Sequence, residues 1–118
     1  MIRVLVVDDS IAFLAAATEV VLAADGFELA GVAQSGEEGL ELAGVSRPDL
    51  ALVDLNMPGI DGRETAARMA NEHPETTTVL MTATLDPAGR SNGLFDKRGL
   101  SPSALTELWE RAQTPSVP

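Results

Sequence analysis

The sequence begins with MIRVLVVDDS, residues 1–10, in which an apolar run ends abruptly on two adjacent carboxylates. The run from Ile2 to Val7 is rich in branched side chains and predicts a buried strand. Asp8 and Asp9 follow it directly. Two such acids are either charges that favour the N-terminus of a following helix or part of a binding site. The rest of the sequence decides between these two interpretations.

Strand and helix patterns alternate along the remainder of the chain. Further strands are predicted at residues 29–33, 49–53, 77–81 and 93–96, and helices at 11–25, 36–45, 62–72 and from 102 onward. The predicted N-caps of these helices are Ser10, Ser35, Asp61 and Ser101. In the last helix, the spacing of Leu105, Leu108, Trp109 and Ala112 predicts one apolar face. Such alternation indicates an α/β fold, a doubly wound parallel sheet with helices on both faces.

Composition narrows the class of protein. The chain has 118 residues, which predicts one domain over residues 1–113 with a frayed tail at 114–118. The net charge of −10 argues against direct binding to nucleic acid, and the absence of cysteine excludes disulfides and thiolate metal sites. Because the apolar runs are too short to cross a bilayer and no segment reads as a signal peptide, we expect a cytoplasmic protein with no membrane partner.

Polar residues follow the predicted strands at the edge where a doubly wound sheet collects its ligands. They are Asp8 and Asp9 after the first strand, Asp54 after the third, Thr82 after the fourth and Lys97 after the fifth. Clustered carboxylates repel one another unless a cation lies among them, and hard oxygen ligands indicate Mg²⁺. Lys97 and Thr82 are then suited to phosphoryl oxygens, and a carboxylate beside the metal can itself accept a phosphoryl group.

Four stretches of the chain resemble the signature motifs of the response-regulator receiver domain of two-component signalling. They are VLVVDDS (4–10), DLALVDLNMPGIDG (49–62), VLMTA (79–83) and FDK (95–97). A weaker similarity joins FELAGVAQSGEEGLELA (27–43) to receivers that precede LuxR-type DNA-binding domains. The resemblance implies a flavodoxin-like five-stranded sheet with the order 2-1-3-4-5. It also implies a phosphorylated switch, similar to the chemotaxis regulators, and not a turnover enzyme.

The resemblance further implies roles for single residues. Asp54 is the expected phosphoacceptor, served by a sensor histidine kinase or phosphotransfer protein, with small phosphodonors as further candidates. The expected Mg²⁺ ligands are Asp8, mostly through water, Asp9, Asp54 and the backbone carbonyl of Asn56. Thr82 and Lys97 are expected to contact the phosphoryl group, and the small Ala83 to leave it accessible. Asn56 and Thr84 match positions that tune the rate of phosphoryl hydrolysis.

The sequence departs from the receiver pattern after the fourth strand. Only the eleven residues Ala83–Gly93 separate Thr82 from Leu94, and they include Pro87, Gly89 and Gly93, so we expect the fourth helix to be shortened or absent. Leu94 occupies the aromatic switch position of the family. Arg98 replaces the proline that usually follows the lysine, which predicts a trans Lys97–Arg98 bond or a rearranged loop. Apolar surface left by a lost helix would favour a homodimer through the altered strand 4–strand 5–helix 5 face.

Two other functions compete with the phosphorylated switch. The short connection and Leu94 favour an atypical receiver that acts as a phosphate-independent docking or dimerisation module. A phosphatase-type hydrolase with an aspartyl nucleophile is disfavoured, because such enzymes usually place a second acid two residues after the nucleophile, where Asn56 stands.

Overall fold

The computed structural model describes residues 1–83 and 94–113. Its strands form one parallel sheet in the order β2-β1-β3-β4-β5, which confirms the predicted fold. The strands are β1 (Ile2–Val7), β2 (Phe27–Ala33), β3 (Leu50–Asp54), β4 (Thr77–Thr82) and β5 (Phe95–Asp96). The described helices are α1 (Ile11–Ala23), α2 (Gly36–Ser46), α3 (Gly62–Glu72), the short 3-10 helix η1 (Lys97–Gly99) and α4 (Pro102–Gln113).

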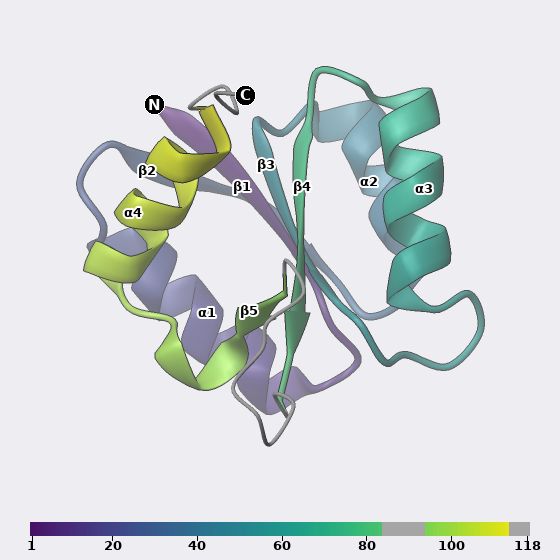
Figure 1. Ribbon diagram of the computed structural model, residues 1–118, viewed down its shortest axis with the longest axis horizontal. Helices are drawn as coiled ribbons and strands as arrows, with labels where there is room; N and C mark the ends of the chain where they lie inside the picture. Colours follow the sequence, from purple (N-terminus) through teal and green to yellow (C-terminus); the bar gives the residue numbers. More distant parts are fainter. Residues whose placement is uncertain (84–93, 114–118) are drawn as a thin grey trace, which may run out of the picture.

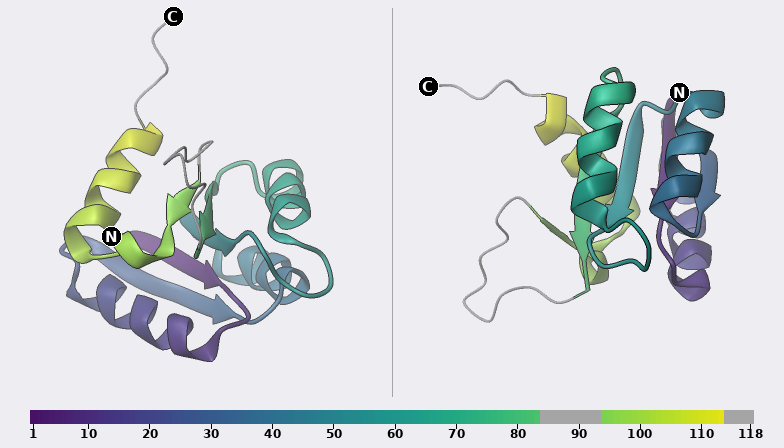
Figure 2. Two further views of the ribbon diagram at one scale, coloured as in Figure 1. Left: turned by 60° about the horizontal axis from the view of Figure 1, so that its bottom comes forward. Right: turned by 90° about the vertical axis from the view of Figure 1, so that its right-hand side faces the viewer.

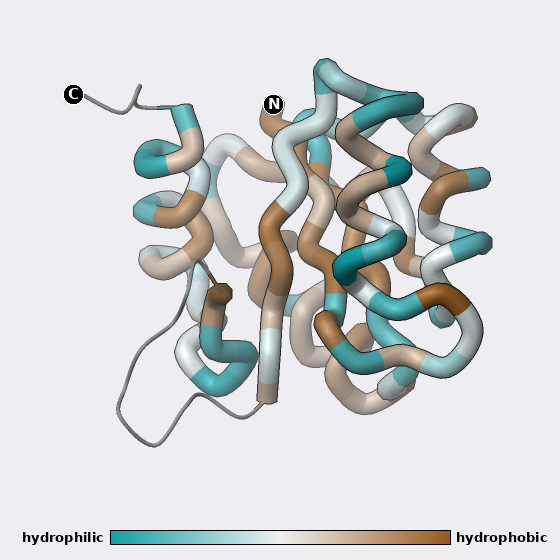
Figure 3. The backbone as a smooth tube through the Cα atoms, turned by 45° about the vertical axis from the view of Figure 1, so that its right-hand side comes forward, coloured by the Kyte–Doolittle hydropathy of each residue, from teal (hydrophilic) through white to brown (hydrophobic). Residues whose placement is uncertain are grey.

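The sheet lies between two pairs of helices, with α1 and α4 on one face and α2 and α3 on the other (Figures 1 and 2). Alternate residues of β1 serve the two faces: Val4 and Val6 pack with α1 and α4, whereas Leu5 and Val7 pack on the side of α2 and α3. Figure 3 shows the hydrophobic residues concentrated in the central strands. Since both faces of β1 are covered, its unbroken apolar run is the pattern expected of an interior parallel strand.

All four predicted N-caps are confirmed by hydrogen bonds. The side-chain oxygens of Ser10, Ser35, Asp61 and Ser101 accept from the backbone N–H three residues later. Several boundaries differ from the prediction by one or two residues. The strand predicted at residues 29–33 begins at Phe27, because Phe27 pairs with Ile2. The first helix ends at Ala23, and Gly26 then turns the chain with φ of 85°.

The apolar face predicted for the last helix is shorter than its spacing indicates. Leu105 and Leu108 are buried, and Trp109 packs half-buried against the same core. Ala112 is exposed and lines a groove together with Val79 and Leu94. The last turn of α4 therefore borders a surface groove and adds nothing to the core.

Two predictions concern the chain that follows β4. The expected loss of the fourth helix falls on residues 84–93, which lie outside the described residues. The expected trans Lys97–Arg98 bond is confirmed, since the described residues contain no cis peptide bond. Within residues 1–83 and 94–113, no helix has both the length and the apolar character needed to cross a bilayer.

Candidate functional site

Three carboxylates meet at the carboxyl edge of the sheet, the lower edge in Figure 1. Asp8 and Asp9 follow β1 and Asp54 ends β3, and one carboxylate oxygen from each lies within 4.8 Å of those from the other two. Asp8 is fully buried and Asp54 is 6% exposed, whereas Asp9 is exposed. The structure thus brings together the three acids that the sequence placed after separate strands.

Lys97 reaches this group from η1. Its Nζ lies 2.5 Å from Asp8 Oδ2 and 3.7 Å from Asp54 Oδ1, and its side chain is only 12% exposed. The ammonium also lies over the ring of Phe13, 4.5 Å from the ring centroid. A short β5 therefore does not keep Lys97 away from Asp54. The closer partner of the ammonium is nevertheless Asp8.

The two oxygens of Asp8 have different partners. Oδ1 accepts a hydrogen bond of 2.8 Å from the backbone N–H of Ser10. Oδ2 is buried and receives no hydrogen bond from any described residue, so its contact with Lys97 is an ion pair without hydrogen-bond alignment. Buried carboxylate oxygens are normally hydrogen-bonded or bound to a cation. Asp8 Oδ2 has an ammonium beside it but no hydrogen bond, and it lies in a group of three carboxylates whose hard oxygen ligands fit a divalent cation such as Mg²⁺.

The surroundings of Asp54 raise its pKa above the ordinary value. Burial is the largest cause, followed by the negative charge of Asp8. Lys97 and a hydrogen bond from the backbone of Asn56 oppose this rise without cancelling it. The ionised form of Asp54 is therefore costly in the metal-free protein, and a cation at the three carboxylates would relieve that cost.

The loop after β3 holds Asp54 against the next helix. The backbone N–H of Leu55 donates to Met81 O of β4, and that of Gly62 donates to Leu55 O. A Cβ at Gly62 would overlap the carbonyl oxygen of Asp54 and come within 2.6 Å of Leu55 Cα. Asn56, whose carbonyl is an expected metal ligand, is exposed in this loop.

The remaining expected site residues lie around the same edge. Thr82 is buried at the end of β4, where it is the register partner of Asp96. Ala83 is exposed beside it, and Leu94 is half-buried at the entrance to β5. Thr84 lies outside the described residues.

Sequence reasoning did not single out Phe13. The sequence indicates that Phe13 lies in the first turn of a helix that follows two acids. That position alone does not predict a contact between the ring and a particular cation. The contact depends on how α1 packs beside η1.

Comparison with known proteins settles the family. The sequence matches the response regulator receiver domain over residues 4–96. The chain belongs to the response regulator receiver family. Receiver domains act in two-component signalling, where they interact with histidine kinases or phosphotransfer proteins. They bind Mg²⁺ at an acidic pocket and are generally switches, not enzymes.

The chain is similar to part of several curated proteins. Response regulator GacA of Pseudomonas viridiflava is 42% identical over 82 residues, covering 70% of this chain and 38% of the relative. A protein-glutamate methylesterase/protein-glutamine glutaminase of Anaeromyxobacter dehalogenans is 42% identical over 112 residues, covering 92% of this chain and 33% of the relative. The chain therefore spans between 24% and 39% of the length of the curated relatives it matches.

The fold has close structural neighbours. The receiver domain of the NarL regulator from Mycobacterium tuberculosis superimposes with a TM-score of 0.82 at 27% identity, covering 97% of this chain and 98% of that one. This similarity agrees with the sheet order and helix arrangement described above.

Proposed function

We propose that this receiver is a phosphoacceptor switch that takes a phosphoryl group onto Asp54 with Mg²⁺. One observation carries the proposal: Asp54 ends β3 beside two further carboxylates and within 3.7 Å of the Lys97 ammonium. A nucleophilic carboxylate, a cation-binding group and a fixed positive charge are the parts that phosphoryl transfer to an aspartate needs.

The transfer follows from the positions of these side chains. A carboxylate oxygen of Asp54 attacks the phosphorus of a phosphohistidine, a P–O bond forms, and the P–N bond to the donor imidazole breaks. The imidazole nitrogen keeps the electron pair of the broken bond and takes a proton from water. Mg²⁺, when bound, supplies positive charge that offsets the charge of the carboxylates and of the phosphoryl oxygens.

Lys97 and Thr82 complete this site in the proposal. The Lys97 ammonium, already between Asp8 and Asp54, pairs with a phosphoryl oxygen, and the Thr82 hydroxyl donates to another. Asp8, Asp9 and the Asn56 carbonyl serve as further Mg²⁺ ligands. Ala83 leaves room beside Asp54, and Asn56 and Thr84 set the rate of phosphoryl hydrolysis.

The source of the phosphate and the surface that reads it also belong to the proposal. We infer a sensor histidine kinase or phosphotransfer protein as the donor, with small phosphodonors as substitutes. Leu94 stands at the switch position, so the signal does not pass through an aromatic side chain there. The homodimer through β4, β5 and α4, the cytoplasmic location and the domain bounds of 1–113 stay predictions.

Intact-mass spectrometry tests the phosphoacceptor. After incubation with acetyl phosphate and Mg²⁺, we expect one phosphoryl adduct on the wild type and on Asp25→Ala, which removes an exposed acid of the α1–β2 turn. The adduct should be absent from Asp54→Ala and from wild type without Mg²⁺. A folded wild type with no adduct would overturn the proposal. The phosphate-independent docking module would then be the better account.

A further inference from the structure

Four residues form a closed ring of contacts at the edge of the site. Asp8 Oδ1 accepts from the backbone N–H of Ser10, and Ser10 Oγ accepts from the backbone N–H of Phe13 at 3.1 Å. The Phe13 ring meets Lys97 Nζ, which returns to Asp8 Oδ2. One short segment, residues 8–13, therefore supplies both a carboxylate and an aromatic face to the same ammonium.

The position of the Lys97 ammonium depends on such contacts because the lysine side chain is flexible. A lysine side chain has four rotatable methylene links, and nothing in its stem fixes the direction of Nζ. The acids on the opposite side offer two partners, Asp8 at 2.5 Å and Asp54 at 3.7 Å. The face of an aromatic ring attracts a cation, and the attraction grows as the cation loses water. Only 12% of the Lys97 side chain is exposed, so its ammonium has lost most of its water and the attraction to the ring is correspondingly stronger.

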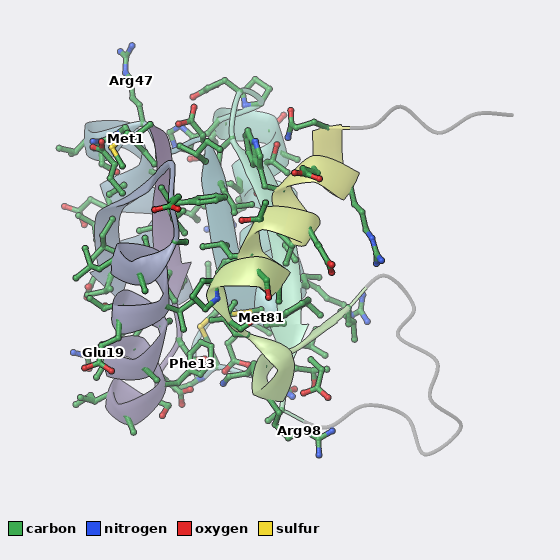
Figure 4. All side chains as sticks on the ribbon, turned by 90° about the vertical axis from the view of Figure 1, so that its left-hand side faces the viewer. Met1, Phe13, Glu19, Arg47, Met81 and Arg98 are labelled. Atoms are coloured by element: carbon green, nitrogen blue, oxygen red, sulfur yellow. The ribbon has the colours of Figure 1, made fainter. Side chains whose placement is uncertain are left out.

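Phe13 is itself held in place. Its backbone is bound in the N-cap of α1, and its side chain packs half-buried against the core formed by α1, α4 and the sheet. Figure 4 shows Phe13 between α1 and the segment that carries Lys97. The ring is therefore held by the N-cap and the core, whereas the Lys97 side chain has more rotatable bonds between its backbone and Nζ.

We propose that Phe13 is a positioning residue for Lys97, whose ring holds the ammonium between Asp8 and Asp54 in readiness for the phosphoryl group. The part that concerns phosphoryl transfer rests on the function proposed above. Without the ring, the ammonium spends part of its time elsewhere, and less of the protein is ready to pair with an incoming phosphoryl oxygen. In this proposal the Phe13 ring acts only through its contact with Lys97.

The chain offers a direct probe of this contact, because Lys97 is its only lysine. Protein labelled with ¹³C,¹⁵N-lysine gives one set of lysine side-chain signals in a metal-free NMR spectrum. Protons above an aromatic face are shifted upfield, so we expect an upfield ε-CH₂ signal in wild type and Phe13→Tyr. In Phe13→Leu, which keeps apolar volume but has no ring face, the signal should move to the position of an ordinary lysine. An unshifted wild-type signal would overturn the proposal.

Phe27→Leu is the matched control. Phe27 begins β2 at the opposite end of the sheet and is also buried against the α1 and α4 core. We expect it to leave the Lys97 signal in place even if it lowers the melting temperature. Movement of the signal in Phe27→Leu as large as that in Phe13→Leu would mean that general loosening of the core moves the lysine, which contradicts the proposal.

Kinetics test the consequence for the switch. We expect Phe13→Leu to slow phosphorylation by acetyl phosphate between about twofold and tenfold, and Phe13→Tyr to restore the rate. In a Lys97→Gln background, the change from Phe13 to Leu should have no further effect. An equal loss in both backgrounds, or no loss in either, would overturn the positioning role. If wild type itself is not phosphorylated, the proposed function fails, while the NMR result still decides the Phe13–Lys97 contact.

Discussion

At the scale of single residues, the charge balance at Asp8 and Asp54 dominates the behaviour of the site. Both carboxylates are buried, and one ammonium serves them both. Lys97 lies nearer Asp8, so Asp54 is the less compensated acid and its pKa is raised by burial and by Asp8. Because ionised Asp54 is destabilised, a bound cation or a covalent bond to its carboxylate would lower the free energy of the site.

The sign of the Asp54 effect on stability follows from that raised pKa. Its pKa in the folded protein lies above the unfolded value of 3.8, so the ionised carboxylate favours unfolding. This cost is fully present above the folded-state pKa and disappears as the pH falls below 3.8. We therefore expect metal-free Asp54→Asn to melt at a higher temperature than wild type at neutral pH. The difference should shrink on acidification.

Asp25→Asn provides the control for that measurement, because Asp25 is exposed in the turn between α1 and β2. Thermal melts followed by circular dichroism across pH 4 to 8 compare the three proteins. An Asp54→Asn variant no more stable than Asp25→Asn at neutral pH would show that Lys97 fully compensates Asp54.

At the scale of elements, the close contact between β3 and α3 fixes the backbone at Asp54 and Leu55. The first residue of α3, Gly62, lies so close to the strand end that a single methyl group would overlap the backbone of Asp54 and Leu55. Backbone atoms cannot turn aside as a flexible side chain can. Glycine is therefore required here for close approach and not for an unusual φ.

Gly62→Ala should consequently damage both stability and the site. We expect a loss of roughly 1–3 kcal/mol or more in the free energy of unfolding, because overpacking forces the β3–α3 loop away from the strand. Phosphorylation by acetyl phosphate should fall at the same time. Urea denaturation monitored through Trp109 fluorescence gives the first quantity, and intact mass gives the second.

Gly99→Ala is the comparison for that variant. A Cβ at Gly99 meets no atom within 4 Å, so the change should stay within about 0.5 kcal/mol. Equal losses for the two variants would mean that close packing of α3 on β3 is not what makes Gly62 necessary.

At the scale of the whole molecule, the net charge of −10 opposes compaction and favours cation uptake. Mg²⁺ that binds the folded protein alone should stabilise it by about 2.7 kcal/mol at a concentration one hundred times its Kd. General screening by salt would also help, so the measurement compares MgCl₂ with NaCl at equal ionic strength. We expect the melting temperature to rise more with MgCl₂.

The variant Asp9→Asn distinguishes Mg²⁺ binding at the three carboxylates from general attraction of Mg²⁺ to the acidic surface. The variant changes the net charge by one unit and removes an exposed member of the three-carboxylate group. It should lose most of the additional stabilisation by MgCl₂. If it keeps that stabilisation in full, the ion acts elsewhere on the acidic surface.

Local sequence patterns were enough to predict the order of elements, the helix caps and the acids at the strand ends. These features are local. A buried strand is seen as an apolar run, and an N-cap is a side chain that accepts a hydrogen bond from the backbone N–H three residues later. Parallel strands then bring Asp8, Asp9 and Asp54 to one edge, so the acidic group follows from topology. The two-residue error at the start of β2 arose because its pairing with β1, and not its own composition, extends the strand.

The closeness of Lys97 to Asp8, the burial of Asp54 and the contact with Phe13 came from tertiary packing. The physical reason is that each depends on the packing of elements far apart in the chain, for which no local pattern exists. Phe13 lies in α1 and Lys97 in η1, and their meeting is set by how both pack beside β1 and β3. The sequence predicts which charged residues lie at the edge of the sheet. The distances between their atoms depend on how the sheet and helices pack.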